Sequence, residues 1–255
     1  DGPDGIREMV RRRVRQGANV IKIGLSKGWI DDQYHAWGDD PLRQVAGMTL
    51  EEVKAAVSEA HVHHIKVSAH YIGEAAVVLA LDGGVDIIEH GYGITEETRA
   101  RLAESQVLVG STISQLYFHR AAYEEFNYPQ WERDLFERHT KQMRIDFEKS
   151  LAAGVRYVLG TDLIGNPTHP QDQAAREFEF AVEWGMDPAT AIVSGMKHGA
   201  EALGLLDEIG TVEVGKHADL IATATDPLAD ITSLQRLTFV MQGGRKIIRN
   251  AERFI

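Results

Sequence analysis

Residues 65–91 read IKVSAHYIGEAAVVLALDGGVDIIEHG, and this stretch decides the fold. An apolar run ends at His70, a helical segment follows over 74–81, a glycine pair marks a turn, and a second apolar run ends at His90. Strand, helix and strand in this order are typical of parallel strands joined by a crossover helix. The alternation extends from residue 5 to about residue 205, which predicts a parallel α/β sheet or barrel.

The expected strands account for only part of a closed barrel. They end near residues 23, 70, 90, 111 and 161, whereas a complete barrel has eight. After residue 205 the pattern changes to short strands over 218–223, 237–242 and 245–249, the last two joined across a glycine pair. We therefore expect two domains, a barrel portion over 1–205 and a small β module over 206–255.

Composition narrows the classes of function. A formal net charge of −11 argues against a broad nucleic-acid surface, which needs clustered cations. The one basic cluster, Arg11-Arg12-Arg13 with Arg15, lies on a predicted helix and is interpreted as a solvated face. No stretch approaches the roughly 18 apolar residues of a membrane span, and no signal-peptide pattern opens the chain, so a cytoplasmic protein is expected. The sequence has no cysteine, which excludes disulfides and thiolate ligands.

Four residues have the chemistry of a metal site: Lys22, His70, His90 and Asp162. Each ends an apolar run that a glycine-containing turn follows, and the carboxyl ends of barrel strands converge on one pocket. Two imidazoles, a carboxylate and a lysine brought together there are the parts of a metal site. Each residue also has a structural interpretation: a surface lysine, two hydrogen-bonded core histidines, and an aspartate that caps a turn.

These runs resemble the amidohydrolase superfamily, in its imidazolonepropionase-like and prolidase-like branch. The resemblance to the family's strand-four, strand-five, strand-six and strand-eight segments rests on Val20-Ile21-Lys22-Ile23, Ser68-Ala69-His70 with Gly73, Ile88-Glu89-His90-Gly91 and Gly160-Thr161-Asp162. The tail resembles the family's C-terminal signature through Gly215-Lys216-His217-Ala218-Asp219-Leu220 and Val240-Met241-Gln242-Gly243-Gly244-Arg245. The resemblance covers nearly the whole chain.

The resemblance implies a TIM-like (β/α)8 metal-dependent hydrolase barrel, with strands four to eight in this chain, and a small C-terminal β-sandwich module. The family's first-strand His-x-His pair has no counterpart in a suitable place, because His61-Val62-His63 lies late in a predicted helix. The chain thus looks like the C-terminal portion of a longer protein. An open half-barrel would expose strand edges, so we expect it to associate with the missing N-terminal barrel portion or with copies of itself as a homo-oligomer.

The resemblance also implies the chemistry. Two divalent metals are expected, Zn by default, with Mn, Co or Fe fitting similarly. Lys22 would carry a CO2-derived carbamate that bridges both ions, while His70 and His90 would hold the second. Asp162 would bind the first metal and the nucleophilic water, and would act as the catalytic proton acceptor. The substrate would be a small-molecule amide: a dipeptide, an N-acyl amino acid or a cyclic amide.

Substrate contacts are expected from four further residues near the strand ends: Tyr71, His169, Tyr117 and His119. Glu89 is expected to face away from the pocket because it precedes His90 on an alternating strand.

Two alternatives stay open. The same metal-bound hydroxide attacks esters, phosphotriesters and carbamates, and specificity lies in the loops. Without the first-strand histidines, the chain would otherwise be an inactive half-barrel fragment or scaffold that needs a partner chain.

Overall fold

The structure, a computed structural model, describes residues 2–25, 47–163, 165 and 170–247. The chain divides into two compact units. The first comprises Asp1–Gly110 with Pro129–Tyr157, and the second comprises Ser111–Tyr128 with Val158–Ile255. The predicted domain boundary near residue 205 lies inside the second unit and stays a prediction.

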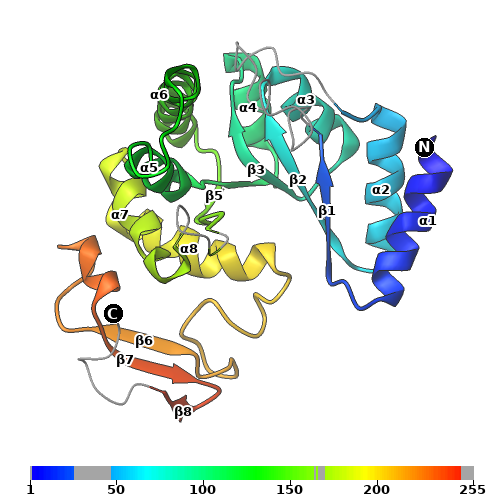
Figure 1. Ribbon diagram of the computed structural model, residues 1–255. Coiled ribbons are helices and arrows are strands. Elements are labelled where there is room, and N and C mark those ends of the chain that lie inside the picture. The colour runs from blue at the N-terminus through cyan, green and yellow to red at the C-terminus, as the bar shows by residue number, and fades with distance from the viewer. Residues whose placement is uncertain (1, 26–46, 164, 166–169, 248–255) are drawn as a thin grey trace. The chain divides into compact units, whose positions relative to one another are not determined.

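A parallel sheet forms the centre of the first unit (Figure 1). Its strands, in sheet order, are β1 (Val20–Gly24), β2 (Lys66–Ile72), β3 (Ile87–Tyr92), β4 (Leu108–Gly110) and β5 (Tyr157–Val158). Pairing is parallel from β1 to β4, and sheet order equals chain order. This order confirms the predicted parallel α/β class.

Helices connect these strands in the manner the sequence predicts. They are α2 (Leu50–Val62), α3 (Glu74–Gly83), α4 (Glu96–Glu104) and α6 (Gln130–Ala152), and α1 (Gly2–Arg15) precedes β1. Thr49 and Glu52 form the capping box at the start of α2, and Thr95 caps α4 by accepting from the backbone N–H of Thr98. Gly84 ends α3 in a left-handed conformation, φ 80°.

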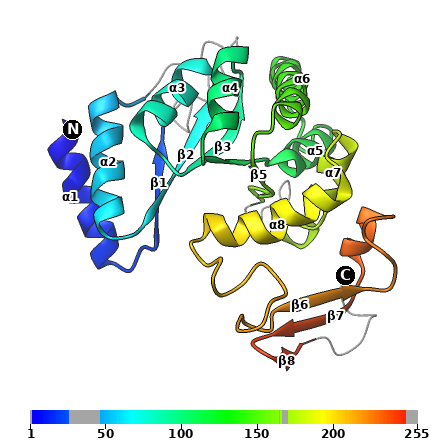
Figure 2. The ribbon, with the colours of Figure 1, turned by 180° about the vertical axis from the view of Figure 1, so that it is seen from behind.

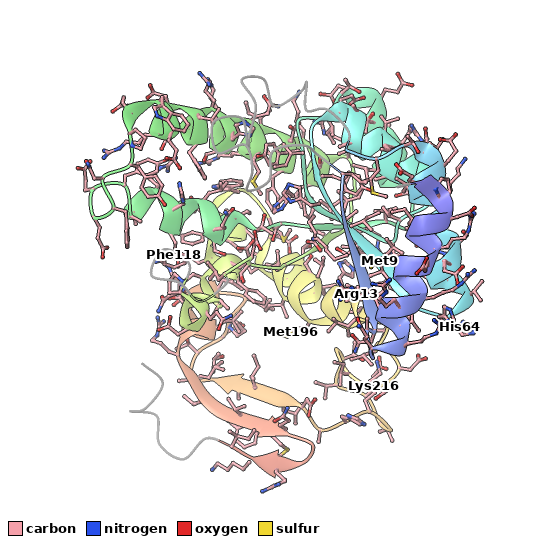
Figure 3. The ribbon with its side chains drawn as sticks, turned by 45° about the vertical axis from the view of Figure 1, so that its right-hand side comes forward. Met9, Arg13, His64, Phe118, Met196 and Lys216 are labelled. Atoms are coloured by element: carbon pink, nitrogen blue, oxygen red, sulfur yellow. The ribbon has the colours of Figure 1, made fainter. Side chains whose placement is uncertain are left out.

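The basic cluster lies on α1, where Figure 3 labels Met9 and Arg13. Arg11, Arg12 and Arg13 are exposed, as expected for a solvated face. Arg11 also makes two 2.8 Å hydrogen bonds to Glu59 of α2. The cluster thus helps to attach α1 to the neighbouring helix.

The second unit combines helices with an antiparallel sheet (Figure 2). Its elements are α5 (Ile113–Ala121), η2 (Gln171–Gln173), α7 (Arg176–Glu183), α8 (Pro188–Ala202), β6 (Leu220–Thr223), η3 (Ile231–Gln235), β7 (Leu237–Gln242) and β8 (Arg245–Lys246). The glycine pair Gly243-Gly244 joins β7 to β8, as predicted, with both residues left-handed. The aromatic stretch 112–130 is irregular in sequence, so α5 is a helix that the sequence does not predict.

Within the described ranges, no helix is both long and apolar enough to cross a membrane.

Candidate active site

His70 and His90 meet at the ends of two adjacent strands. Nε2 of His90 lies 2.9 Å from Nδ1 of His70, and the rings approach edge to face with centroids 4.6 Å apart. His90 is 9% exposed. The first unit therefore brings together the two histidines that the sequence predicts as metal ligands.

His90 reaches this position because its backbone is left-handed, with φ 71°. The strand register places Lys22 beside Ser68, and His70 beside Glu89, so regular alternation would turn His90 to the opposite face. The left-handed residue breaks that alternation at the end of β3.

Glu89 lies on the same face of the sheet as Lys22, although the sequence predicted that it would face away from the pocket. Its Oε1 lies 3.5 Å from Nζ of Lys22 and accepts a 2.5 Å hydrogen bond from the hydroxyl of Ser68. The expectation that Glu89 faces away is wrong, because it assumed a regular strand through His90. Glu89 instead provides the anion next to Lys22.

Both histidines are held neutral. Burial, then the charge of Lys22, lowers the pKa of His70 to about 4, and Glu89 opposes this shift. Burial, then electrostatic interactions with His70 and Lys22, lowers the pKa of His90 well below its usual value. Neutral imidazole is the form that binds metal ions.

The donors of the first unit fit part of a metal site. Two converging neutral imidazoles are common ligands of Zn and related ions. Within the described residues, however, no group of three or more His, Asp or Glu side chains is arranged to hold an ion. Further ligands, such as a carbamate on Lys22 or Asp162, stay predictions.

Tyr71 directly follows His70 in the chain and is completely buried. Burial raises the pKa of its hydroxyl, which has no hydrogen-bond partner among the described residues. A buried hydroxyl of this kind is available to a ligand, and its predicted contact with substrate stays a prediction.

In the second unit, Asp162 follows β5 in an exposed, left-handed conformation, φ 52°. The carbonyl of Gly160 accepts a 2.8 Å hydrogen bond from the backbone N–H of Thr112, and the Thr161 hydroxyl accepts from Leu163 N–H at 3.3 Å. These bonds fix the segment that carries Asp162. Its predicted approach to the histidines stays a prediction, and His169 lies outside the described residues.

Tyr117 and His119 lie on α5 and make extensive packing contacts. The ring of Tyr117 stacks on Phe180 with centroids 3.8 Å apart, and its hydroxyl accepts a 3.1 Å hydrogen bond from Trp184 Nε1. His119 is 6% exposed and packs edge to face with Tyr128. Packing accounts for both side chains, and their predicted contact with substrate stays a prediction.

Glu177 is a buried carboxylate that sequence reasoning missed. It accepts hydrogen bonds from the Ser111 hydroxyl, from Ile113 N–H at 2.8 Å and from Ser114 N–H at 2.7 Å. It therefore caps the start of α5 and fixes the turn at Thr112. Burial raises the pKa of this carboxyl, and the hydrogen bonds oppose the shift. The caps it makes span more than 60 residues of sequence, so no local pattern indicates them.

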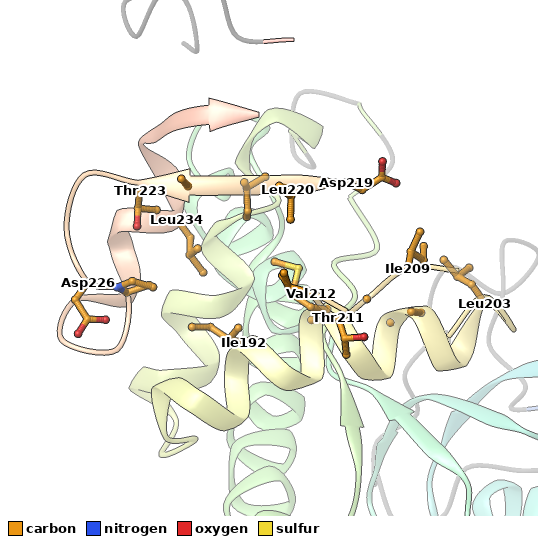
Figure 4. A pocket seen from close by; sticks show the side chains of 18 of the residues that line it. Ile192, Leu203, Ile209, Thr211, Val212, Asp219, Leu220, Thr223, Asp226 and Leu234 are labelled. Atoms are coloured by element: carbon orange, nitrogen blue, oxygen red, sulfur yellow. The ribbon is translucent and has the colours of Figure 1, made fainter. Parts of the chain in front are cut away.

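A cavity of about 820 Å³ lies in the second unit between α8 and β6 (Figure 4). Its wall is mostly apolar and includes Ile192, Leu203, Val212, Leu220 and Leu234. No predicted site residue lines it, so we do not assign the reaction to it.

The fold and the site define a class: a parallel α/β protein with paired neutral histidines at the carboxyl ends of neighbouring strands. The family model described as Amidohydrolase family matches residues 7–247. The chain therefore belongs to the amidohydrolase family.

Named relatives agree with this assignment. Ochratoxinase from Aspergillus niger is 32% identical over 253 residues, which covers 96% of this chain and 49% of the relative. A crystal structure of ochratoxinase from A. niger superposes with a TM-score of 0.82 at 29% identity, covering 96% of this chain and 54% of that one. A Xaa-Pro dipeptidase crystallised with methionine in its active site superposes with a TM-score of 0.83 at 30% identity, covering 98% and 59%. The chain thus spans about half the length of the ochratoxinase it matches.

Proposed function

We propose that the protein to which this chain belongs is a metal-dependent hydrolase of carbon–nitrogen amide bonds. The substrate class is a dipeptide, an N-acyl amino acid or a cyclic amide. The observation that carries the proposal is the pair of neutral histidines in contact at the ends of β2 and β3, with Lys22 on the same sheet face. The family, and a dipeptidase among its structural neighbours, support it.

The finer architecture belongs to the same proposal. The five parallel strands would be the last five of an eight-stranded barrel, and the three-stranded sheet would be part of a β-sandwich. The remaining strands would come from the N-terminal barrel portion. A homo-oligomer and a cytoplasmic location complete the proposal.

We propose the following roles for the residues of this chain in metal binding and catalysis. His70 and His90 would hold a divalent ion, Zn by default, and Lys22 as a carbamate would become an anionic ligand instead of a cation that repels metal. A bound metal supplies a water of lowered pKa and polarises the scissile carbonyl. Asp162 would accept the proton of the attacking water and pass it to the leaving nitrogen. Tyr71 would donate its hydroxyl proton to a substrate oxygen.

Conversion of Lys22 to a carbamate has a consequence for Glu89. The lysine now forms an ion pair with Glu89 at 3.5 Å, whereas a carbamate there would face a like charge. Glu89 would then have to turn away or take up a proton. Loss of this ion pair is therefore expected to accompany carbamate formation.

The test is metal content together with hydrolysis of matched substrates by the protein and by His90→Asn. We expect bound divalent metal, hydrolysis of N-acyl amino acids or Xaa-Pro dipeptides that a chelator abolishes, and loss of at least about 10³-fold activity in the variant. His217→Asn is the matched control because its side chain is exposed and its ion pair with Glu208 is long, at 3.9 Å.

Other outcomes contradict the proposal in different ways. Metal-dependent turnover of esters, phosphotriesters or carbamates, without amide hydrolysis, would identify the related hydrolase class. Absence of both metal and activity would identify a scaffold that needs a partner chain.

A further inference from the structure

The turn after His90 is attached to α6 by two buried hydrogen bonds. The hydroxyl of Tyr92 lies 2.8 Å from Nδ1 of His139, and the backbone N–H of Gly93 donates to Oδ2 of Asp146 at 2.7 Å. His139 is fully buried and Asp146 is 2% exposed. The two residues are seven apart, so they lie on one face of the helix.

Asp146 is itself held in one orientation. Its Oδ1 forms an ion pair with Arg99 of α4, and its Oδ2 also accepts a 2.9 Å hydrogen bond from Gln142. Arg99 is 2% exposed and donates from Nε to the Ser150 hydroxyl at 3.2 Å. A buried ion pair gains little net stability over apolar packing, but here it fixes which carboxylate oxygen faces Gly93.

The turn needs such an anchor because its backbone is unusual. His90, Gly91 and Gly93 have φ values of 71°, 58° and 77°. A left-handed residue that bears a side chain is disfavoured, and it persists where the surrounding structure over-determines it. The opposite side of the turn is fixed as well, because Gly73 N–H donates to the Tyr92 carbonyl at 2.8 Å.

We propose that Asp146, oriented by Arg99 and assisted by the Tyr92–His139 hydrogen bond, is a positioning residue for His90. It acts through the backbone of Gly93, keeps His90 left-handed, and so holds its imidazole against His70. Only the metal-binding readout below rests on the proposed function. The anchor itself is a property of the folded chain.

Asp146→Asn tests the anchor because asparagine has one oxygen where aspartate has two. Arg99 attracts that oxygen, so the amide NH2 turns toward the N–H of Gly93 and the anchor is lost. The double variant Arg99→Met/Asp146→Asn removes the competing cation and returns the oxygen to Gly93. The single variant should therefore be impaired and the double variant restored.

Two measurements report whether the contact between Asp146 and Gly93 is intact. Amide hydrogen exchange of segment 88–94 should become about tenfold faster in Asp146→Asn, as expected for loss of one hydrogen bond to a charged group. Affinity of the metal-free protein for Zn²⁺, measured by calorimetry, should fall about 10–100-fold, the usual effect of a lost outer contact. Both should return close to the wild-type values in the double variant.

Phe147→Leu is the matched control. Phe147 lies on the same helix, is buried, and packs against Tyr157 with ring centroids 4.7 Å apart. The variant should lower stability through this packing while it leaves the side chains of Asp146 and His139 unchanged. The proposal is overturned if Asp146→Asn changes exchange and affinity no more than Phe147→Leu does at equal loss of thermal stability, or if the double variant restores neither.

Two further outcomes are decisive. If the wild type binds no Zn²⁺, the proposed function fails, while exchange of segment 88–94 still decides the anchor. If the double variant does not fold, Tyr92→Phe replaces it, because this variant removes only the hydroxyl that contacts His139. Unchanged exchange in either Tyr92→Phe or Asp146→Asn would then overturn the proposal, because both contacts are part of it.

Discussion

The two units each contain a turn with a left-handed non-glycine residue, and each turn is held by a buried carboxylate from a distant helix. His90 is held by way of Asp146, and Thr112 by way of Glu177. The carboxylates differ in their partners. Asp146 has the cation of Arg99, whereas the described donors to Glu177 are one hydroxyl and two backbone N–H groups.

This difference separates two ways of supporting a turn. Removal of a carboxylate that is paired with a buried cation takes away part of the compensation for that buried charge. A carboxylate whose described hydrogen-bond donors are all neutral has no cation to stabilise its charge. Burial therefore destabilises the charged form, which is why the pKa of Glu177 is raised. The support of the first turn should therefore be more sensitive to mutation. The support of the second turn should depend on pH, because the pKa of Glu177 is raised.

The largest effect is expected for Asp146→Ala. Among the described residues, removal of the carboxylate leaves the buried Arg99 only its ion pair with Glu96, whose side chain is largely exposed, so the free energy of unfolding should fall by up to about 3–5 kcal/mol. Urea denaturation measures this loss. Arg99→Met/Asp146→Ala should recover part of it, and a loss below about 1 kcal/mol in the single variant would contradict the role assigned to the ion pair.

His70 should give the metal-free protein a stability that rises with pH. Its pKa drops from 6.5 to about 4 on folding, so the unfolded state binds more protons between these values. The contribution is fully present above pH 6.5 and is lost as the pH falls to 4, with a total of roughly 3 kcal/mol at 1.4 kcal/mol per pKa unit. Urea unfolding with a chelator present measures it.

His70→Asn is the control for that measurement. The difference in unfolding free energy between wild type and variant should shrink as the pH falls from 7 to 4. A difference that is independent of pH would show that His70 is not held neutral by folding.

Glu177→Gln should have a smaller effect with the opposite pH dependence. At pH 7 the amide offers one oxygen to donors that now use two, which should cost about 1–2 kcal/mol. Because folding raises the pKa of Glu177, the folded state binds more protons and the wild type gains stability as the pH falls toward 4.5. Gln does not titrate, so the difference between wild type and variant should widen at low pH in urea unfolding. A narrowing would contradict the raised pKa.

The same two turns show which parts of this structure the sequence predicts and which it does not. Strand ends at Lys22, His70 and His90 follow from local apolar runs, and the sheet confirms them. The direction of Glu89 does not follow, because alternation fails at a left-handed residue that local pattern does not indicate. Helix α5 was missed for a related reason: its first residues are capped by Glu177, more than 60 residues away.

Thr112→Gly should give the smallest effect, and its sign tests whether the second turn is strained. A β-branched residue at φ 51° bears a steric cost that glycine avoids, although glycine loses more chain entropy on folding. Relief of the steric cost should outweigh the loss of chain entropy, so Thr112→Gly should raise the free energy of unfolding by about 0.5–1 kcal/mol. Glu177 accepts from the neighbours of Thr112 rather than from its side chain, so its hydrogen bonds survive the change. Thr112→Ala is the control, because it keeps a Cβ and should gain less. A loss of stability in Thr112→Gly would mean that the Thr112 side chain, and not Glu177 alone, holds this turn.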